Sequence, residues 1–259
     1  MKMTIRRIGI IVLLAMMSGV LVCAEDPQPP AYQIADNTFF DPDKKETKTE
    51  KYQFGMEYRI EAGYAQHWQR SQAVTFPDMY LHGARLGATF TFLLPLHFNI
   101  QTGVLYTILY GRAEQHWRSQ TAQTVQTEYI NHCVLAHNLT VPVRMFYVIP
   151  VWKQLNLFFY TGPQLHIGLA QNDYMDKHLS AGTEEWLKGQ GIPTEPYDRM
   201  HGELVRANIQ WGVGGGLEWD KYRLQSGYDF GLNNMVRNPQ LKGQYMSEWG
   251  WYVSFCYRL

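Results

Sequence analysis

The stretch Tyr52-Gln-Phe-Gly-Met-Glu-Tyr-Arg-Ile-Glu-Ala-Gly-Tyr64 alternates between two kinds of side chain. Its even positions are apolar or aromatic, and its odd positions are polar, charged or glycine. A period of two places these sets on opposite faces of a β-strand and leaves no helical interpretation. The stretch has about 13 residues, and a strand that crosses a membrane needs about 9–11. The sequence therefore predicts a two-faced strand long enough to cross a bilayer.

The same alternation recurs in seven further runs, which are 86–92, 96–110, a run ending at 139–147, 155–169, 205–219, 222–231 and 249–259. The connections between the eight runs are alternately long and short, and the long ones are 66–79, 111–128, 171–203 and 232–247. An even number of strands with short turns at one end and long loops at the other is typical of outer-membrane barrels. We expect an all-β fold, an eight-stranded antiparallel up-and-down transmembrane β-barrel over residues 52–259, in which the first strand pairs with the second and the last.

Several local features follow from this pattern. A connection over 93–95 would pair Phe92 with Leu96 and Phe90 with Phe98, because both runs have their even positions on the apolar face. A two-residue turn at 220–221 makes Glu218 and Arg223 inward neighbours and Trp219 and Tyr222 outward neighbours. Within the longest loop, 183–188 predicts one helical turn that ends at Gly189.

The glycines indicate which face lies inside. Most strand glycines share the polar face: Gly55, Gly63, Gly87, Gly103, Gly162, Gly212, Gly214, Gly216, Gly227 and Gly231. Glycine is a poor strand former, but a narrow eight-stranded lumen needs small residues, whereas bulky aromatic side chains would not fit there together. This favours a membrane orientation over a soluble, lipocalin-like barrel with an apolar interior.

Aromatic residues gather at the two ends of the predicted strands, where they would form interfacial girdles. At the short-turn end these are Tyr52, Tyr147, Trp219, Tyr222 and Tyr257; at the long-loop end they are Tyr64, Tyr110, Trp249 and Trp251.

Residues 1–24 have the pattern of a cleaved signal peptide, because basic residues are followed by an apolar run. Lipidation at Cys23 is the rival interpretation. A polar, proline-broken lead-in over 25–51 follows, and we expect it to be flexible and periplasmic.

Removing 1–24 takes the chain from 23 basic residues to 20, against 23 acidic ones. Without a basic excess, nucleic acid is not an expected partner. Cys133 and Cys256 are expected to remain free thiols.

The predicted lumen carries charges of both signs: Glu57, Arg59, Glu61, Arg85, Arg144, Arg206, Glu218, Arg223, Asp229 and Arg258. Because unpaired charges are costly to bury, we expect a salt-bridge network that fills the interior. A narrow channel or a small-ligand barrel is the alternative. His82, His132 and His137 raise the possibility of a lipid-modifying enzyme at the outer rim, but no spacing singles out a nucleophile. We expect no catalytic residue, no cofactor and no metal site.

Four segments together resemble the outer membrane protein beta-barrel domain family, which includes PorT-like proteins and OmpA-type eight-stranded barrels. The segments are Leu139-Thr-Val-Pro-Val-Arg144, Tyr160-Thr-Gly-Pro163, Gly214-Gly-Gly-Leu-Glu218 and Tyr228-Asp-Phe-Gly-Leu232. The resemblance spans roughly 50–259 and implies a Gram-negative outer-membrane protein. Because short turns are periplasmic in such barrels, the loop pattern places both termini in the periplasm. The partners that the resemblance implies are outer-membrane lipid, lipopolysaccharide and the barrel-assembly machinery, with secretion-system proteins as a further possibility. The family's best-known relatives serve protein secretion, and the resemblance carries no catalytic residue across.

Overall fold

The structure, a computed structural model, describes residues 55–72, 77–94, 97–121, 124–237 and 245–259. The expected signal peptide 1–24, the possible lipidation site Cys23, the lead-in 25–51 and the girdle residue Tyr52 lie outside these residues. Among the described residues, no helix is both long and apolar enough to cross a membrane.

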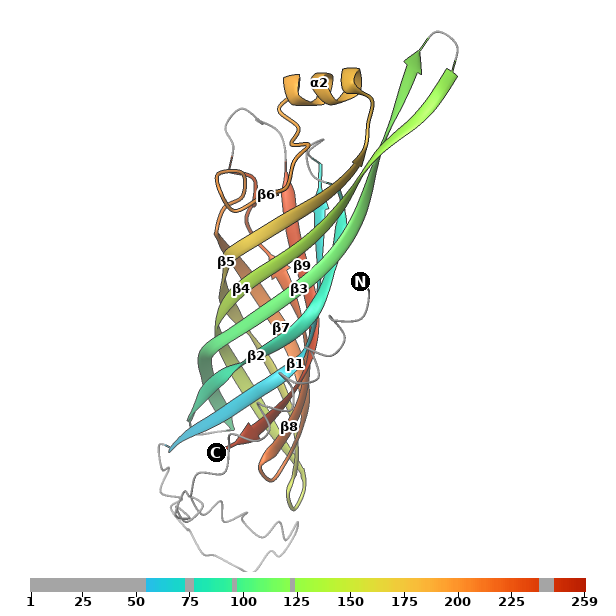
Figure 1. Cartoon of the computed structure of the whole chain (residues 1–259). Coiled ribbons are helices and arrows are strands. Elements are labelled where there is room, and N and C mark those ends of the chain that lie inside the picture. The colour runs from blue at the N-terminus through green and yellow to red at the C-terminus, as the bar shows by residue number, and fades with distance from the viewer. Residues whose placement is uncertain (1–54, 73–76, 95–96, 122–123, 238–244) are drawn as a thin grey trace, which may run out of the picture. The chain divides into compact units, whose positions relative to one another are not determined.

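Eight long antiparallel strands form a closed ring (Figure 1). Consecutive strands pair as neighbours, β4 pairs with β5, and the first and last strands, β1 and β9, pair to close the barrel. The two-residue strand β6 pairs with β5 near the C-terminal end of β5. One helix, α2, follows β5 in the chain. The bounds are β1 (Gly55–Ser71), β2 (Met79–Leu93), β3 (Phe98–Thr121), β4 (Thr124–Trp152), β5 (Leu155–His178), α2 (Ala181–Gly189), β6 (Tyr197–Asp198), β7 (Ala207–Trp219), β8 (Tyr222–Gly231) and β9 (Met246–Arg258).

The barrel is apolar outside and polar inside. In β1, Tyr58 is 56% exposed, whereas its neighbour Arg59 is 1% exposed. The same contrast recurs around the ring, because the outward positions are large apolar residues and the buried positions include glutamates, arginines and glutamines. A soluble barrel would show the reverse. The inside-out arrangement therefore agrees with the predicted membrane orientation, and the eight-stranded transmembrane barrel fold is confirmed.

The β7–β8 hairpin has the predicted register. Glu218 pairs with Arg223 and Trp219 with Tyr222 across the turn. Asp220 adopts a left-handed conformation, with φ at 52°, which aspartate tolerates better than most residues. The two-residue turn is thus made without the usual glycine.

The predicted β2–β3 register is wrong. Phe92 pairs with Ile100 instead of Leu96, and Phe90 pairs with Thr102 instead of Phe98. Five residues lie between the paired Leu93 and Asn99. The loop is therefore longer than the expected three residues, but it keeps an odd length. The odd length is what preserves the apolar face on both strands.

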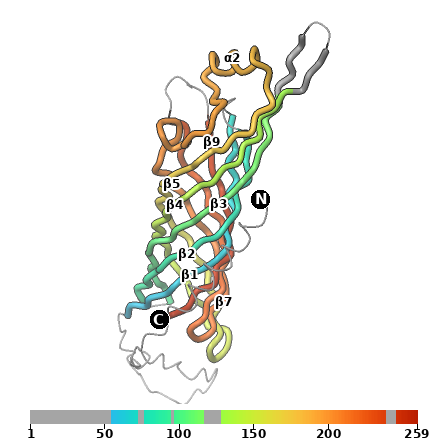
Figure 2. Tube along the Cα trace, in the orientation of Figure 1, coloured from blue at the N-terminus to red at the C-terminus, as the bar shows by residue number. Residues whose placement is uncertain are grey.

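One of the expected long loops is largely strand, and a second begins as strand. Most of the predicted loop 111–128 belongs to β3 and β4, which continue as a hairpin beyond the rest of the barrel (Figures 1 and 2). Similarly, β5 continues to His178, past the expected loop start at 171. Alternation disappears in these segments because an outward face that no longer meets lipid has no reason to be apolar, while backbone pairing continues. The sequence pattern therefore reports the membrane-facing part of a strand and misses its extension.

Helix α2 forms where a helical turn was predicted, but it begins earlier. Ser180 caps it by accepting a hydrogen bond from the Thr183 backbone N–H, which satisfies one of the free amides at a helix N-terminus. Leu187 packs with Ile130 of β4 and Ile192 in a small buried cluster. This apolar contact anchors the helix to the outer part of the β4–β5 wall.

Candidate functional site

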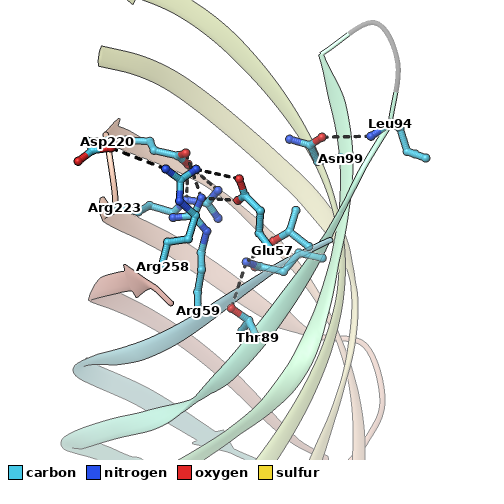
Figure 3. Close-up of polar contacts among 11 residues, drawn as sticks. Glu57, Arg59, Thr89, Leu94, Asn99, Asp220, Arg223 and Arg258 are labelled. Carbon is cyan, nitrogen blue, oxygen red and sulfur yellow. Dashed lines mark hydrogen bonds and ion pairs between the residues drawn. The ribbon is translucent and has the colours of Figure 1, made fainter. Parts of the chain in front are cut away.

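The lumen is the part of the chain where chemically active side chains gather. At the short-turn end, a lower ion cluster comprises Glu57, Arg59, Glu218, Arg223 and Arg258 (Figure 3). The Arg59 guanidinium bridges two carboxylates, at 2.6 Å from Glu57 and 3.0 Å from Glu218. Arg258 donates to the other Glu57 oxygen at 2.9 Å and reaches the rim. The cluster joins β1, β7, β8 and β9, and its Arg59–Glu218 pair links two strands that are not neighbours in the ring.

Above this cluster, two buried aromatic rings on β4 and β5, those of Phe146 and Phe158, lie beside Arg223. The Arg223 guanidinium lies 5.0 Å from the Phe146 ring centroid and 4.8 Å from that of Phe158. These two rings are themselves 5.5 Å apart. A guanidinium can stack on an aromatic face and still donate hydrogen bonds at its edge. Arg223 therefore connects the ion cluster to the β4–β5 side of the barrel.

The middle of the lumen is built around two further arginines. Arg85 forms an ion pair with Glu61 at 3.1 Å and lies 4.0 Å from the Tyr252 ring centroid. Arg144 lies over Tyr160 and Tyr252, at 4.9 and 5.3 Å from their ring centroids. The hydroxyls of these tyrosines are hydrogen-bonded to each other, which joins β5 to β9. Asp229 lies 3.9 Å from Arg85 and completes the layer.

Two glycines make room for this tyrosine pair. A Cβ atom at Gly214 or at Gly227 would collide with the Tyr160 hydroxyl. The small residues on the polar face are therefore needed where large side chains cross the lumen. This accounts for two of the glycines on which the predicted orientation depends, Gly214 and Gly227.

A third layer near the long-loop end contains His67, His166 and Glu248, which we call the His–Glu cluster. His67 Nδ1 lies 2.9 Å from Glu248 Oε1, and His166 Nε2 lies 3.3 Å from the same oxygen. All three side chains are buried. They come from β1, β5 and β9, at sequence positions that share no motif spacing. Sequence reasoning missed this cluster, because only the strand register and closure of the ring bring the three residues together.

Asp173, Arg199 and His132 form a further buried ion group, the outer ion group, towards the long-loop end. Asp173 accepts hydrogen bonds from Arg199 Nη2 at 2.6 Å and Nε at 3.0 Å, and it lies 2.9 Å from His132 Nδ1. Burial would raise the pKa of Asp173, but the His132 hydrogen bond and Arg199 hold it below its usual value. Burial raises the pKa of the nearby Glu203 above its usual value. Two carboxyl groups near each other therefore differ in acidity: the pKa of Asp173 is lowered and that of Glu203 is raised.

The predicted lumen residues are placed as follows. Glu57, Arg59, Glu61, Arg85, Arg144, Glu218, Arg223 and Asp229 are buried inside the barrel, and Arg258 is partly exposed at the rim. The expectation is wrong for Arg206, which is exposed in the bend that precedes β7. Its carbonyl accepts a hydrogen bond from the Gly168 N–H at 2.7 Å.

The described members of the predicted girdles point outward. Tyr147, Trp219, Tyr222, Tyr257, Tyr64 and Trp251 are exposed, and Tyr110 and Trp249 are partly exposed. Neighbouring girdle residues also pack together; for example, the Tyr222 and Tyr257 rings lie 5.5 Å apart.

The three histidines considered for an enzyme site are not brought together. His82 is exposed on the outer face of β2 beside Tyr110, and His137 lies beside Tyr106, whose hydroxyl is 2.6 Å from its Nδ1. Only His132 is buried, in the outer ion group. This arrangement does not form a nucleophile–base pair. Both described cysteines, Cys133 and Cys256, are free.

No family model matches this chain, and no curated protein matches its sequence. Several solved structures are similar to it. Ail, the attachment invasion locus protein of Yersinia pestis, is 12% identical, with a TM-score of 0.32, over 78% of this chain and 98% of its own. Neisserial surface protein A is 9% identical, with a TM-score of 0.39, over 79% and 99%. The N-terminal barrel domain of Pseudomonas aeruginosa OprF is 9% identical, with a TM-score of 0.33, over 80% and 100%.

Proposed function

We propose that this chain is an integral outer-membrane barrel whose lumen is filled by side chains and which acts as a structural or interaction protein. The observation that carries the proposal is the set of side-chain contacts across the lumen between strands that are not neighbours in the ring. Arg59 of β1 meets Glu218 of β7, Arg223 of β8 meets Phe158 of β5, and Tyr160 of β5 meets Tyr252 of β9. The interior of an eight-stranded barrel is just wide enough for side chains to fill it or for one small ligand, and here side chains meet across it. Such a barrel is suited to presenting surfaces and unsuited to conducting solutes.

The outward face supports the outer membrane as the location. Large apolar side chains cover the outside of every long strand, and aromatic residues flank them at both ends. Outer membranes hold barrels with such an apolar band and aromatic girdles. In the usual orientation the short turns and both termini are periplasmic, while the β3–β4 hairpin and α2 lie outside the cell. The first expected partners are membrane lipid and lipopolysaccharide along the wall, with the barrel-assembly machinery during insertion.

The outer elements are held firmly enough to serve as a binding surface. The Arg199–Asp173 pair and the apolar contact of Leu187 with Ile130 fix β6 and α2 to the barrel. On this platform Trp186 of α2 is 56% exposed. Exposed tryptophan is frequent in protein-binding surfaces. We propose that the surface around α2 takes part in the interaction.

An association with a PorT-like secretion system is a narrower form of this proposal. It rests on the four resembling sequence segments, which fall in β4, β5, β7 and β8. A narrow channel or a small-ligand barrel is the alternative function, and conductance measurements distinguish it from a closed lumen.

Site-specific photo-crosslinking in intact cells tests the interaction. A photoreactive phenylalanine analogue would replace Trp186, with Trp152 at the short-turn end as the matched control, since both tryptophans are exposed. We expect position 186 to give a discrete crosslinked product that position 152 does not give. Identical product patterns from both positions, or no product from position 186, would contradict an interaction surface at α2.

A further inference from the structure

We propose that the His–Glu cluster of His67, His166 and Glu248 binds a divalent transition metal ion, with Zn²⁺ as the reference ion. The three side chains offer two imidazole nitrogens and one carboxylate oxygen, and these ligand atoms all lie within 4.8 Å of one another. Two histidines and one carboxylate form a recognised ligand set for Zn²⁺ and for other first-row ions, with at least one coordination position left for another ligand.

The separations fit a bound ion. Two ligand atoms that are each about 2.1 Å from a tetrahedral ion lie about 3.4 Å from each other. His166 Nε2 and Glu248 Oε1 are 3.3 Å apart, and His67 Nδ1 and Glu248 Oε1 are 2.9 Å apart. All three ligand atoms lie within 4.8 Å of one another, which is close enough for one ion to contact all three after the side chains adjust.

In His166 and Glu248, the polar atom that would not bind the ion already has a hydrogen-bond partner. His166 Nδ1 lies 3.0 Å from the Thr140 hydroxyl, which leaves Nε2 directed at the cluster. Glu248 Oε2 accepts a hydrogen bond from Gln69 at 2.8 Å, which leaves Oε1 facing the histidines. Outer partners of this kind orient metal ligands and tune their basicity. A Cβ at Gly250 would lie 2.9 Å from His67 Cδ2, so the glycine leaves space for the His67 ring.

The charge of the cluster also favours a cation. The ion-pair partners of the Glu248 carboxylate, within the described part of the chain, are the two histidines. Elsewhere in the lumen the buried glutamates Glu57, Glu61 and Glu218 have arginine partners. A buried carboxylate needs a compensating positive charge. Here the charge comes from a metal ion or from a protonated histidine, and the ligand geometry favours the metal.

Such an ion would join three separate parts of the wall. β1 and β9 form the seam where the first and last strands meet, and β5 lies on the other side of the lumen. One ion held by all three strands would fasten the seam to the opposite wall near the outer mouth. An ion that binds only the folded barrel raises its stability according to its concentration relative to Kd.

The test uses the untagged full chain, folded in detergent, stripped with a chelator and then titrated with Zn²⁺ or Co²⁺ alone. We expect about one ion per barrel, and a Co²⁺ absorption band in the visible region whose intensity indicates fewer than six ligands. His166→Gln and Glu248→Gln should each weaken binding at least tenfold. His137→Gln, which changes a histidine on the outer wall, should bind as the unmodified chain does.

The heat-dependent gel shift of folded barrels shows whether each variant is folded. If a ligand variant does not fold, the Co²⁺ spectrum and the Zn²⁺-dependent rise in unfolding temperature of the unmodified chain still decide the matter. The proposal is overturned if the folded unmodified chain takes up no ion. It is equally overturned if folded His166→Gln and Glu248→Gln bind Zn²⁺ as tightly as His137→Gln, since the histidine pair would then serve only as a proton-bearing partner of Glu248.

Discussion

Arg223 and Glu218 face each other across the β7–β8 turn and share two hydrogen bonds, at 2.9 Å from Nε and 2.6 Å from Nη2 to the same carboxylate oxygen. The short turn fixes this pairing, because only two residues separate the paired Trp219 and Tyr222. Arg59 donates to the other oxygen of Glu218. The pair therefore belongs both to a local hairpin and to the network that crosses the lumen.

Replacing Arg223 should destabilise the barrel strongly. Removing one partner of a buried ion pair typically costs about 3–5 kcal/mol. For Arg223→Gln we expect about 3 kcal/mol, at the low end, because Arg59 still compensates Glu218. Arg206→Gln is the control, and as an exposed substitution it should change the free energy of unfolding by less than about 0.5 kcal/mol. Urea-induced unfolding in lipid vesicles measures both, and equal stabilities would refute the network.

Adding a methyl group at Gly227 should also be destabilising. The new Cβ would meet the Tyr160 hydroxyl and the Tyr252 ring, and overpacking of this kind costs about 1–3 kcal/mol. Combining Gly227→Ala with Tyr160→Phe should cost less than the sum of the two single changes, because the hydroxyl that collides is gone. Gly182→Ala in α2 is the control, since nothing lies within 4 Å of its added Cβ. Strict additivity would show that the tyrosine does not approach Gly227.

The contact between α2 and β5 should persist in moderately acidic solution. Glu184 of α2 lies 2.6 Å from Lys177 of β5 and 3.0 Å from Lys188. These two lysines lower the pKa of Glu184 from 4.5 to about 2. Because the folded-state pKa is depressed, the stabilisation is fully present above the ordinary pKa and is lost as the pH falls through about 2.

An NMR titration of the Glu184 carboxyl measures this pKa directly. Lys177→Met should move the midpoint up towards the ordinary glutamate value, whereas Lys153→Met, at the opposite end of the barrel, should leave it unchanged. A midpoint near 4.5 in the unmodified chain would show that Lys177 does not bind Glu184 in solution.

Much of the fold could be predicted because membrane strands impose a simple rule on side chains. Every residue of β1 from Met56 to Tyr64 faces either lipid or lumen, and the alternation records which. The β7–β8 pairing could also be predicted, because a two-residue turn is compatible with a single register. The β2–β3 register could not be predicted. Any loop with an odd number of residues keeps the apolar residues of both strands on the same face, so the alternation does not distinguish a loop of three residues from one of five.

The parts that sequence reasoning missed depend on three-dimensional closure or lie outside the bilayer. The extension of β3 and β4 has no apolar face, so its sequence lacks the alternation that would predict a strand. Arg206 has the correct parity for the lumen, but the chain bends before β7 begins. His67, His166 and Glu248 meet only because the ring closes β9 onto β1 and places β5 across from them.

Single-channel recording tests the closed lumen most directly. The purified, folded chain would be inserted into a planar lipid bilayer, with insertion verified by the protection of its strands from protease. Because side chains from non-neighbouring strands meet at successive levels of the lumen, we predict a membrane whose conductance is unchanged from that of lipid alone. Discrete, reproducible conductance steps from the inserted protein would contradict the filled lumen and establish the channel function instead.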